Sequence, residues 1–150
     1  MTTLPEGNTP MEALYTAEAL ATGAGRNGHV ATDDRRVEFD LAIPKAMGGS
    51  GDGANPEQLF AAGYAACFHS ALQSVARAQK VQIEDSSVGA RVHIGSNGQG
   101  GFDLAVELEV VIPTLPHEQA QALADAAHQV CPYSNATRGN IDVTITVSDD

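Results

Sequence analysis

The 150-residue sequence contains no tryptophan, and aromatic residues make up only 5% of it. The core of a monomer would therefore rest mainly on valine, isoleucine, leucine and alanine, which bury less area per residue than aromatic side chains do. Apolar residues still account for 43% of the chain, which is enough for one core at this length. The composition predicts a single domain that would gain from oligomerisation.

Basic residues are also scarce, with 8 Lys and Arg against 19 Asp and Glu, for a formal net charge of −11. A phosphate backbone or an anionic membrane is bound by clustered Lys and Arg. We therefore expect neither a nucleic acid nor a membrane as a partner.

Long apolar runs are missing as well. No stretch approaches the ~18 consecutive apolar residues of a membrane-spanning helix, and the first residues lack a basic segment followed by an apolar one. These features predict a cytoplasmic protein.

Cysteine occurs only twice, at Cys67 and Cys131. Two cysteines do not make the disulfide framework of a secreted domain, so they are either unrelated buried thiols or a redox pair. Apart from His69, which lies two residues after Cys67, the histidines are scattered, and among them only His128 lies near a cysteine. Two ligands are too few for a zinc site, so we expect no metal and no cofactor.

Hydrophobic patterns and turn residues divide the chain into a flexible tail at 1–10 and one domain at 11–150. The turn at Asn97-Gly98 predicts a hairpin. The order of elements favours an α+β fold with a mostly antiparallel sheet. We expect strands at 14–23, 37–43, 86–95, 101–113 and 141–147, and helices at 55–80 and 117–130.

The start of the long helix is marked by Asn55, Pro56, Glu57 and Gln58. Asn55 suits the N-cap, Pro56 the first helical position, Glu57 the positive helix end, and Gln58 completes a capping box. The glycine-rich segment at 46–55 lacks the Gly-Lys-Ser/Thr of a phosphate-binding loop, so it reads as a connector.

Cys67 lies on this helix, on a face that it shares with Phe60, Tyr64 and Phe68. His69 is turned about 200° away and cannot act as its base. A reactive thiol needs a nearby cation, which must come from another segment, and Arg26 in a glycine-rich turn is a candidate. Cys67 could equally be a small buried hydrophobic residue.

The segments NPEQLFAAGYAACF and VCPYSNATRGN closely resemble organic hydroperoxide resistance proteins, a branch of the OsmC-like family of thiol peroxidases. YTAEALATGAGRNGHV and DLAIPKAMGG extend the resemblance to roughly residues 14–147. It implies an OsmC-like fold in which a long central helix carries the nucleophile, and an intertwined homodimer. It also implies that Cys67 is the nucleophile, that Cys131 resolves it, that Arg26 holds the thiolate, and that Glu57 orients Arg26.

The resemblance further implies an organic hydroperoxide reductase, in which Cys67 becomes a sulfenic acid and then a disulfide with Cys131. The product is an alcohol, and a dithiol, expected to be a lipoyl group on a partner protein, reduces the disulfide. Phe60, Tyr64 and Phe68 would suit a bulky organic peroxide. The alternative is a non-catalytic OsmC-like stress protein that binds a small molecule or a lipid.

Helix geometry adds one prediction. Glu57 and Cys67 are ten residues apart on one helix, roughly 15 Å in rise, which is too far for one arginine head group to contact both. We therefore predict that Arg26 and Glu57 of one chain complete the pocket around Cys67 and Cys131 of the other.

Overall fold

The computed structural model describes residues 11–149, so the tail predicted at 1–10 lies outside the described residues. The chain divides into two compact units, Met1–Ala54 and Asn55–Asp150. That residues 11–150 form one domain stays a prediction.

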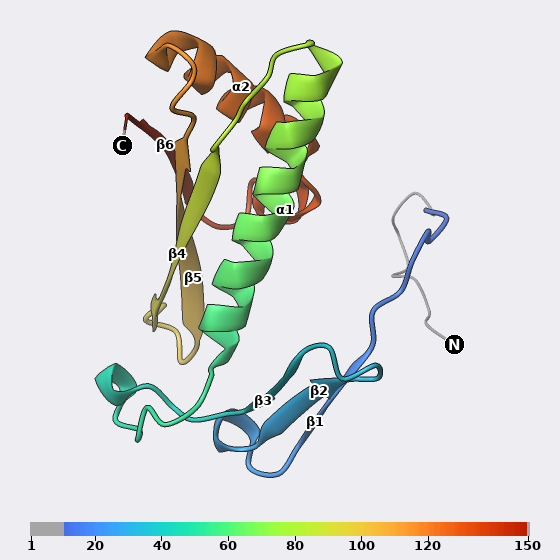
Figure 1. Ribbon diagram of the computed structural model, residues 1–150. Helices are drawn as coiled ribbons and strands as arrows, with labels where there is room; N and C mark the ends of the chain where they lie inside the picture. The colour runs from blue at the N-terminus through green and yellow to red at the C-terminus, as the bar shows by residue number, and fades with distance from the viewer. Residues whose placement is uncertain (1–10, 150) are drawn as a thin grey trace. The chain divides into compact units, whose positions relative to one another are not determined.

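Unit 2 contains three helices and a three-stranded sheet (Figure 1). Helix α2 has the predicted bounds, and Pro132 starts a short third helix after it. In chain order the elements are α1 (Pro56–Ala78), β4 (Ser87–Ser96), β5 (Phe102–Val111), α2 (His117–Val130), α3 (Pro132–Thr137) and β6 (Val143–Ser148).

Helix α1 begins at the predicted residue for the predicted reason. The side-chain oxygen of Asn55 accepts a hydrogen bond from the backbone N–H of Gln58 at 2.8 Å. The side chain of Gln58 accepts one from the N–H of Asn55 at 3.1 Å, which completes the capping box. The backbone N–H groups of Asn55 and Gln58 are thereby satisfied, and Pro56 at the first helical position has no N–H to satisfy.

The sheet of unit 2 has the strand order β4-β5-β6. Strands β4 and β5 pair antiparallel, and the loop between them closes with a bond from the N–H of Asn97 to the carbonyl of Gly101 at 3.0 Å. Strand β6 pairs parallel with β5, because the chain crosses over through α2 and α3 before it returns. The α+β class is confirmed, and three of the four strand pairings in the described part of the chain are antiparallel.

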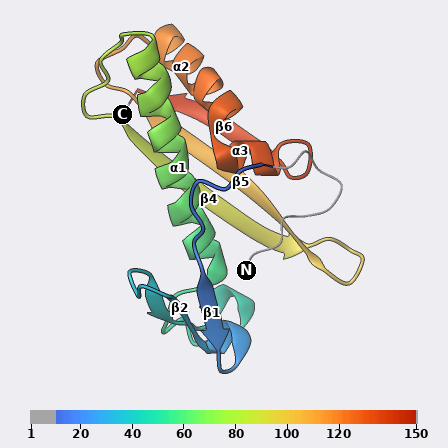
Figure 2. The same ribbon diagram turned by 90° about the vertical axis from the view of Figure 1, so that its right-hand side faces the viewer.

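The core of unit 2 lies between this sheet and its helices, and α1 and α2 cover the same face of the sheet (Figure 2). Along β5, Val106, Leu108 and Val110 are buried, whereas Glu107 and Glu109 between them point the other way. The helices contribute the remaining large side chains, among them Tyr64, Phe68, Leu72 and Leu123.

Unit 1 is a three-stranded antiparallel sheet of β1 (Ala19–Thr22), β2 (His29–Thr32) and β3 (Glu38–Asp40). Three predictions for this unit were wrong. The strand expected at 14–23 covers four residues, the strand expected at 37–43 covers three, and β2 was missed. β2 has no apolar alternation that would mark a strand, and it is stabilised by hydrogen bonds to neighbours on both sides.

A tight turn joins β1 to β2 through the 3-10 helix η1 (Gly25–Asn27), which carries Arg26. A Cβ on Gly28 would lie 2.2 Å from the carbonyl oxygen of Thr22, so this position requires glycine. A second 3-10 helix, η2 (Lys45–Met47), follows β3.

Unit 1 buries little apolar surface. Among its described residues, Ala42 is the one buried hydrophobic side chain. Leu20, Val37 and Phe39 on or beside its strands are 70%, 42% and 43% exposed. A small sheet needs a covered apolar face for stability, so these side chains require a further packing partner.

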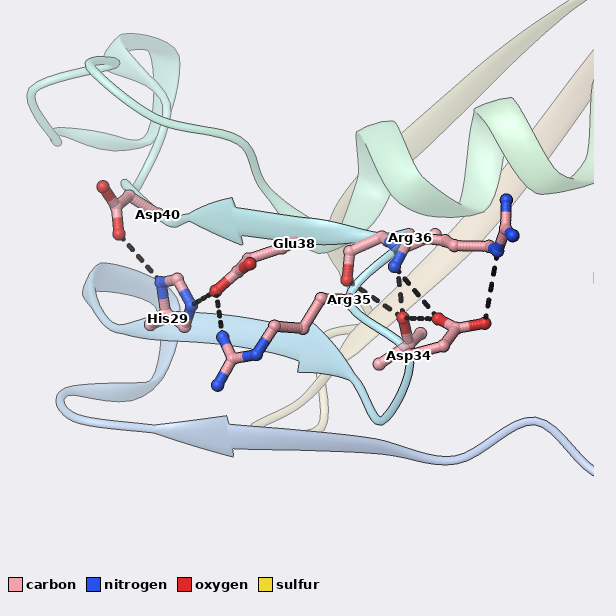
Figure 3. Close-up of polar contacts among 8 residues, drawn as sticks. His29, Asp34, Arg35, Arg36, Glu38 and Asp40 are labelled. Atoms are coloured by element: carbon pink, nitrogen blue, oxygen red, sulfur yellow. Dashed lines mark hydrogen bonds and ion pairs between the residues drawn. The ribbon is translucent and has the colours of Figure 1, made fainter.

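The central strand β2, the edge strand β3 and the turn between them carry a charged cluster around His29 (Figure 3). Its Nδ1 lies 2.8 Å from Asp40 and its Nε2 lies 2.9 Å from Glu38, which also pairs with Arg35 at 2.6 Å. The hydrogen bonds with Asp40 and Glu38 raise the pKa of His29 above its usual value. The protonated imidazolium is therefore the form that this cluster favours.

The stabilisation from His29 should be present below pH ~6.5 and be lost as the pH rises through the higher pKa of the folded state. We expect an NMR titration of His29 to show a midpoint above that of an isolated histidine, and Asp40→Asn to lower it. Because the cluster is exposed, the effect on stability should be small. A midpoint that is unchanged in Asp40→Asn would contradict this assignment.

Candidate active site

The two cysteines of the chain lie side by side in unit 2. Cys67 lies in the middle of α1, and Cys131 lies at the corner where α2 ends and α3 begins. Their sulfur atoms are 3.6 Å apart, and both thiols are free. Because a disulfide bond is about 2.05 Å long, a sulfur movement of roughly 1.5 Å would join them.

Cys67 is partly exposed, whereas Cys131 is fully buried. Cys67 is therefore the thiol that a substrate can reach from solution, whereas Cys131 is inaccessible to solvent. That Cys67 is the nucleophile and Cys131 the resolving thiol stays a prediction.

Burial raises the pKa of the Cys67 thiol. The backbone N–H of Tyr133 donates to the sulfur and lowers the pKa, while the neighbouring thiol of Cys131 raises it again. The net direction is upward, so these surroundings favour the neutral thiol. A reactive thiolate at this position needs additional positive charge.

His69 does not supply that charge. Its Nε2 lies 2.9 Å from the hydroxyl of Ser86, in a side-chain group that also includes Gln73. The structure agrees with the prediction that His69 and Cys67 point to different faces of α1.

An aromatic cluster lies beside Cys67. The ring of Tyr133 is 6.1 Å from that of Phe60 and 5.6 Å from that of Tyr64, measured between centroids. Gly63 on α1 makes room for it, because a Cβ there would lie 2.8 Å from the hydroxyl of Tyr133. A glycine inside a helix costs up to about 1 kcal/mol relative to alanine, and the close approach of this ring explains its presence.

A groove with a volume of about 720 Å³ runs along this cluster. It is lined mainly by apolar side chains, including Phe60, Phe102, Leu104, Tyr133 and Ile141. Of the three predicted substrate contacts, Phe60 lines the groove, whereas Tyr64 and Phe68 are fully buried in the core. Tyr64 and Phe68 belong to the hydrophobic core, and their contact with a substrate stays a prediction.

The two predicted charged residues lie in different units. Arg26 is part of η1 in unit 1, and Glu57 lies half-buried in the first turn of α1 in unit 2. Their predicted pairing, and the action of Arg26 on Cys67, stay predictions.

Comparison with known proteins identifies the family. Residues 49–146 match the family model described as OsmC-like protein. The organic hydroperoxide resistance protein of Xanthomonas axonopodis pv. citri is 50% identical over 142 residues, which are 93% of this chain and 99% of that protein. The chain belongs to the organic hydroperoxide resistance proteins of the OsmC-like family.

Two further members of the family agree with this assignment. The organic hydroperoxide resistance protein OhrB of Bacillus subtilis is 47% identical over 133 residues, which cover 89% of this chain and 97% of that one. The crystal structure of an organic hydroperoxide resistance protein from Elizabethkingia anophelis is 55% identical, with a TM-score of 0.88. It covers 93% of this chain and 100% of its own, so the predicted OsmC-like fold is confirmed.

The family model includes Glu57, Cys67 and Cys131, whereas Arg26 lies before the matched segment. The full-length relatives extend the match to about nine-tenths of the chain.

Sequence reasoning did not assign the polar side chains next to Cys131. Ser134, Thr137 and Tyr64 form a buried group of hydroxyls, with His128 at its edge. The spacing of His128 and Ser134, three residues before and after Cys131, was the available signal.

No helix in residues 11–149 is both long and apolar enough to cross a membrane. Nor do these residues contain a group of three or more His, Cys, Asp or Glu side chains that could hold a metal ion.

Proposed function

We propose that the protein is a thiol-dependent peroxidase that reduces organic hydroperoxides to alcohols. The observation that carries this proposal is the pair of free thiols 3.6 Å apart, one partly exposed and the other buried. Membership of the organic hydroperoxide resistance proteins supports the class of substrate.

In the proposed reaction the thiolate of Cys67 attacks the distal oxygen of the hydroperoxide and the O–O bond breaks. The alkoxide takes up a proton and leaves as the alcohol, and Cys67 becomes a sulfenic acid. The thiol of Cys131 then displaces the hydroxyl of the sulfenic acid, which releases water and forms the Cys67–Cys131 disulfide.

A dithiol returns the enzyme to its starting state. Its first thiolate attacks the disulfide to form a mixed disulfide, and its second thiol completes the exchange, so that the dithiol leaves oxidised. The resemblance favours a lipoyl group on a partner protein as this dithiol. The reaction uses the sulfur atoms of the chain itself and requires no cofactor.

Arg26 and Glu57 have supporting roles in this proposal. The raised pKa of Cys67 creates the need for a cation, and a guanidinium beside the sulfur would lower that pKa. Glu57 would fix the plane of the guanidinium through a charge-assisted pair.

We infer that the working form is an intertwined homodimer. Two observations support it: unit 1 leaves Leu20, Val37 and Phe39 exposed, and the rise of α1 separates Glu57 from Cys67 by roughly 15 Å. A second copy of the chain would cover those apolar side chains and allow one site to draw on two chains.

The second candidate is a non-catalytic domain that binds a small apolar molecule in the groove. The raised pKa of Cys67 favours it, because a protonated thiol is a poor nucleophile. The rate at which an alkylating agent modifies Cys67 at neutral pH separates the two candidates, since only the peroxidase requires a fast reaction.

The test of the proposed function is the decay of tert-butyl hydroperoxide in the presence of the purified protein and dihydrolipoamide. We expect turnover with production of the alcohol in equal amount. A folded protein whose Cys67 is neither oxidised nor rapidly alkylated would support the binding domain instead.

A further inference from the structure

The position of Cys131 depends on the corner between α2 and α3. It is the C-terminal cap of α2 and the N-terminal cap of α3, so its backbone belongs to both helices. Its N–H donates to the carbonyl of Ala127, and its carbonyl accepts from the N–H of Asn135, each at 2.9 Å. Whatever holds this corner against α1 therefore sets the distance between the two sulfur atoms.

Three hydroxyls join the corner to α1. The hydroxyl of Tyr64 on α1 lies 2.8 Å from that of Ser134 and 3.2 Å from that of Thr137, both on α3. Tyr64 and Ser134 are completely buried, and Thr137 is 6% exposed. We call Tyr64, Ser134 and Thr137 the hydroxyl cluster.

The hydroxyl cluster lies close to both sulfur atoms along the chain. Tyr64 precedes Cys67 by three residues on α1, and Ser134 follows Cys131 by three residues. Tyr64 and Ser134 are thus each about one helical turn from a thiol, and Thr137 follows Ser134 by three residues. The contact between Tyr64 and Ser134 ties α1 to α3 directly beside the cysteine pair.

His128 extends the cluster to the end of α2. Its Nδ1 lies 2.8 Å from the hydroxyl of Ser134, and Arg138 donates to its backbone carbonyl. Burial first, and then the charge of Arg138, lower the pKa of His128, while Asp125 opposes them. A neutral ring has one nitrogen without a proton, which can accept from Ser134.

One assignment of protons gives each of the three hydroxyls an acceptor. Thr137 donates to the backbone carbonyl of Ser134 at 3.2 Å, Tyr64 donates to Ser134, and Ser134 donates to Nδ1 of His128. No buried side-chain polar atom in the described residues lacks a partner. A fully satisfied buried network has one favoured geometry, so it holds its helices more strictly than apolar packing does.

We propose that the hydroxyl cluster positions the resolving cysteine: it holds Cys131 within reach of oxidised Cys67 and so favours disulfide formation over a second oxidation. This inference rests on the proposed thiol chemistry. The sulfenic acid of Cys67 has two competing fates. Condensation with Cys131 forms the disulfide and releases water, whereas a second hydroperoxide converts it to a sulfinic acid and leaves as the alcohol.

The test uses Tyr64→Phe and Ser134→Ala, each of which removes one hydroxyl from the cluster. We expect Ser134→Ala to keep the wild-type rate at which the first hydroperoxide oxidises Cys67, and in Tyr64→Phe the rate of disulfide formation is compared with that variant's own rate of first oxidation. Disulfide formation should slow by about fivefold to tenfold, as for the loss of one hydrogen bond. Quenched-flow alkylation with mass spectrometry measures both steps, and the fraction of sulfinic acid under excess hydroperoxide should rise in both variants.

Ser86→Ala is the matched control. Like Ser134→Ala, it removes a serine hydroxyl that contacts a histidine ring, because the hydroxyl of Ser86 lies 2.9 Å from Nε2 of His69. His69 lies on a different face of α1 from Cys67. It should change neither rate. Equal slowing in Ser86→Ala would show a general loss of stability and overturn the positioning role, as would wild-type rates of disulfide formation in folded Tyr64→Phe and Ser134→Ala.

A reaction with oxidised glutathione tests this inference without hydroperoxide and so separates it from the proposed function. Cys67 attacks it and releases one glutathione thiol, and Cys131 then displaces the second from the mixed disulfide. If the wild-type protein does not consume hydroperoxide, the proposed function fails, but the release of the second glutathione still reports on the position of Cys131. Slower release of the second glutathione in Tyr64→Phe supports the inference, and an unchanged rate overturns it. If Tyr64→Phe does not fold, the same measurement is made with Ser134→Ala.

Discussion

Cys67→Ser is expected to abolish hydroperoxide turnover, with a loss on the order of 10³-fold or more. The serine hydroxyl is not ionised near neutral pH, and an alcohol is a far weaker nucleophile toward the O–O bond than a thiolate. The assay is the decay of tert-butyl hydroperoxide with dihydrolipoamide as the reductant. The substitution changes one atom at a partly exposed position, so the variant should remain folded.

Cys131→Ser is the companion variant, because it removes the other thiol of the same pair. We expect it to consume the first equivalent of hydroperoxide at the wild-type rate and then to accumulate the sulfenic acid of Cys67. Mass spectrometry after trapping with a sulfenic-acid reagent checks this. If Cys67→Ser consumed one equivalent and accumulated a sulfenic acid at Cys131, while Cys131→Ser consumed none, the roles of the two thiols would be reversed.

Arg26→Ala should lower the rate of hydroperoxide reduction at neutral pH by about a hundredfold. Burial raises the pKa of Cys67, and the proposal assigns to Arg26 the positive charge that opposes this effect. Without that charge the pKa of Cys67 rises, so the thiolate forms only at higher pH. The pH profile of alkylation at Cys67 should therefore move upward, and part of the activity should return in alkaline buffer.

Arg36→Ala is the control for this experiment. Arg36 also lies in unit 1, but its side chain is 87% exposed and pairs with Asp34 at 3.8 Å. It should leave both the rate and the alkylation profile unchanged. An Arg26→Ala variant with the wild-type alkylation profile would remove Arg26 from the site.

Mixing the two inactive variants tests the shared site. In a heterodimer, the Cys67→Ser chain still has Arg26 and the Arg26→Ala chain still has Cys67. If each site draws on both chains, one of the two sites therefore contains both residues and is intact. Random exchange of subunits should restore about a quarter of the wild-type activity if each site draws on both chains. No recovery, with exchange confirmed by mass spectrometry, would mean that Arg26 and Cys67 act within one chain.

Local signals predicted the helices well. The capping box of Asn55 and Gln58 lies within four residues, so its hydrogen bonds can be read from the sequence, and the structure contains both. The bounds of α2 were also predicted, because its apolar spacing and the following Pro132 are local features.

Strand pairing was predicted less well. The four residues of β2 form a strand because two neighbours supply its hydrogen bonds, and nothing in their own pattern signals this. The parallel pairing of β6 with β5 likewise depends on a crossover through two helices. Such pairings join residues far apart in the chain, which periodicity cannot detect.

The sequence by itself determined helices α1 and α2, the α+β class and, through its resemblance, the family to which the chain belongs. Each of these depends on residue types and spacings within short segments. Only the tertiary structure decided the 3.6 Å between two sulfur atoms that are 64 residues apart in the chain. It also decided the burial that raises the pKa of Cys67 and the contacts of the hydroxyl cluster, because all three arise where α1 packs against the corner of α2 and α3.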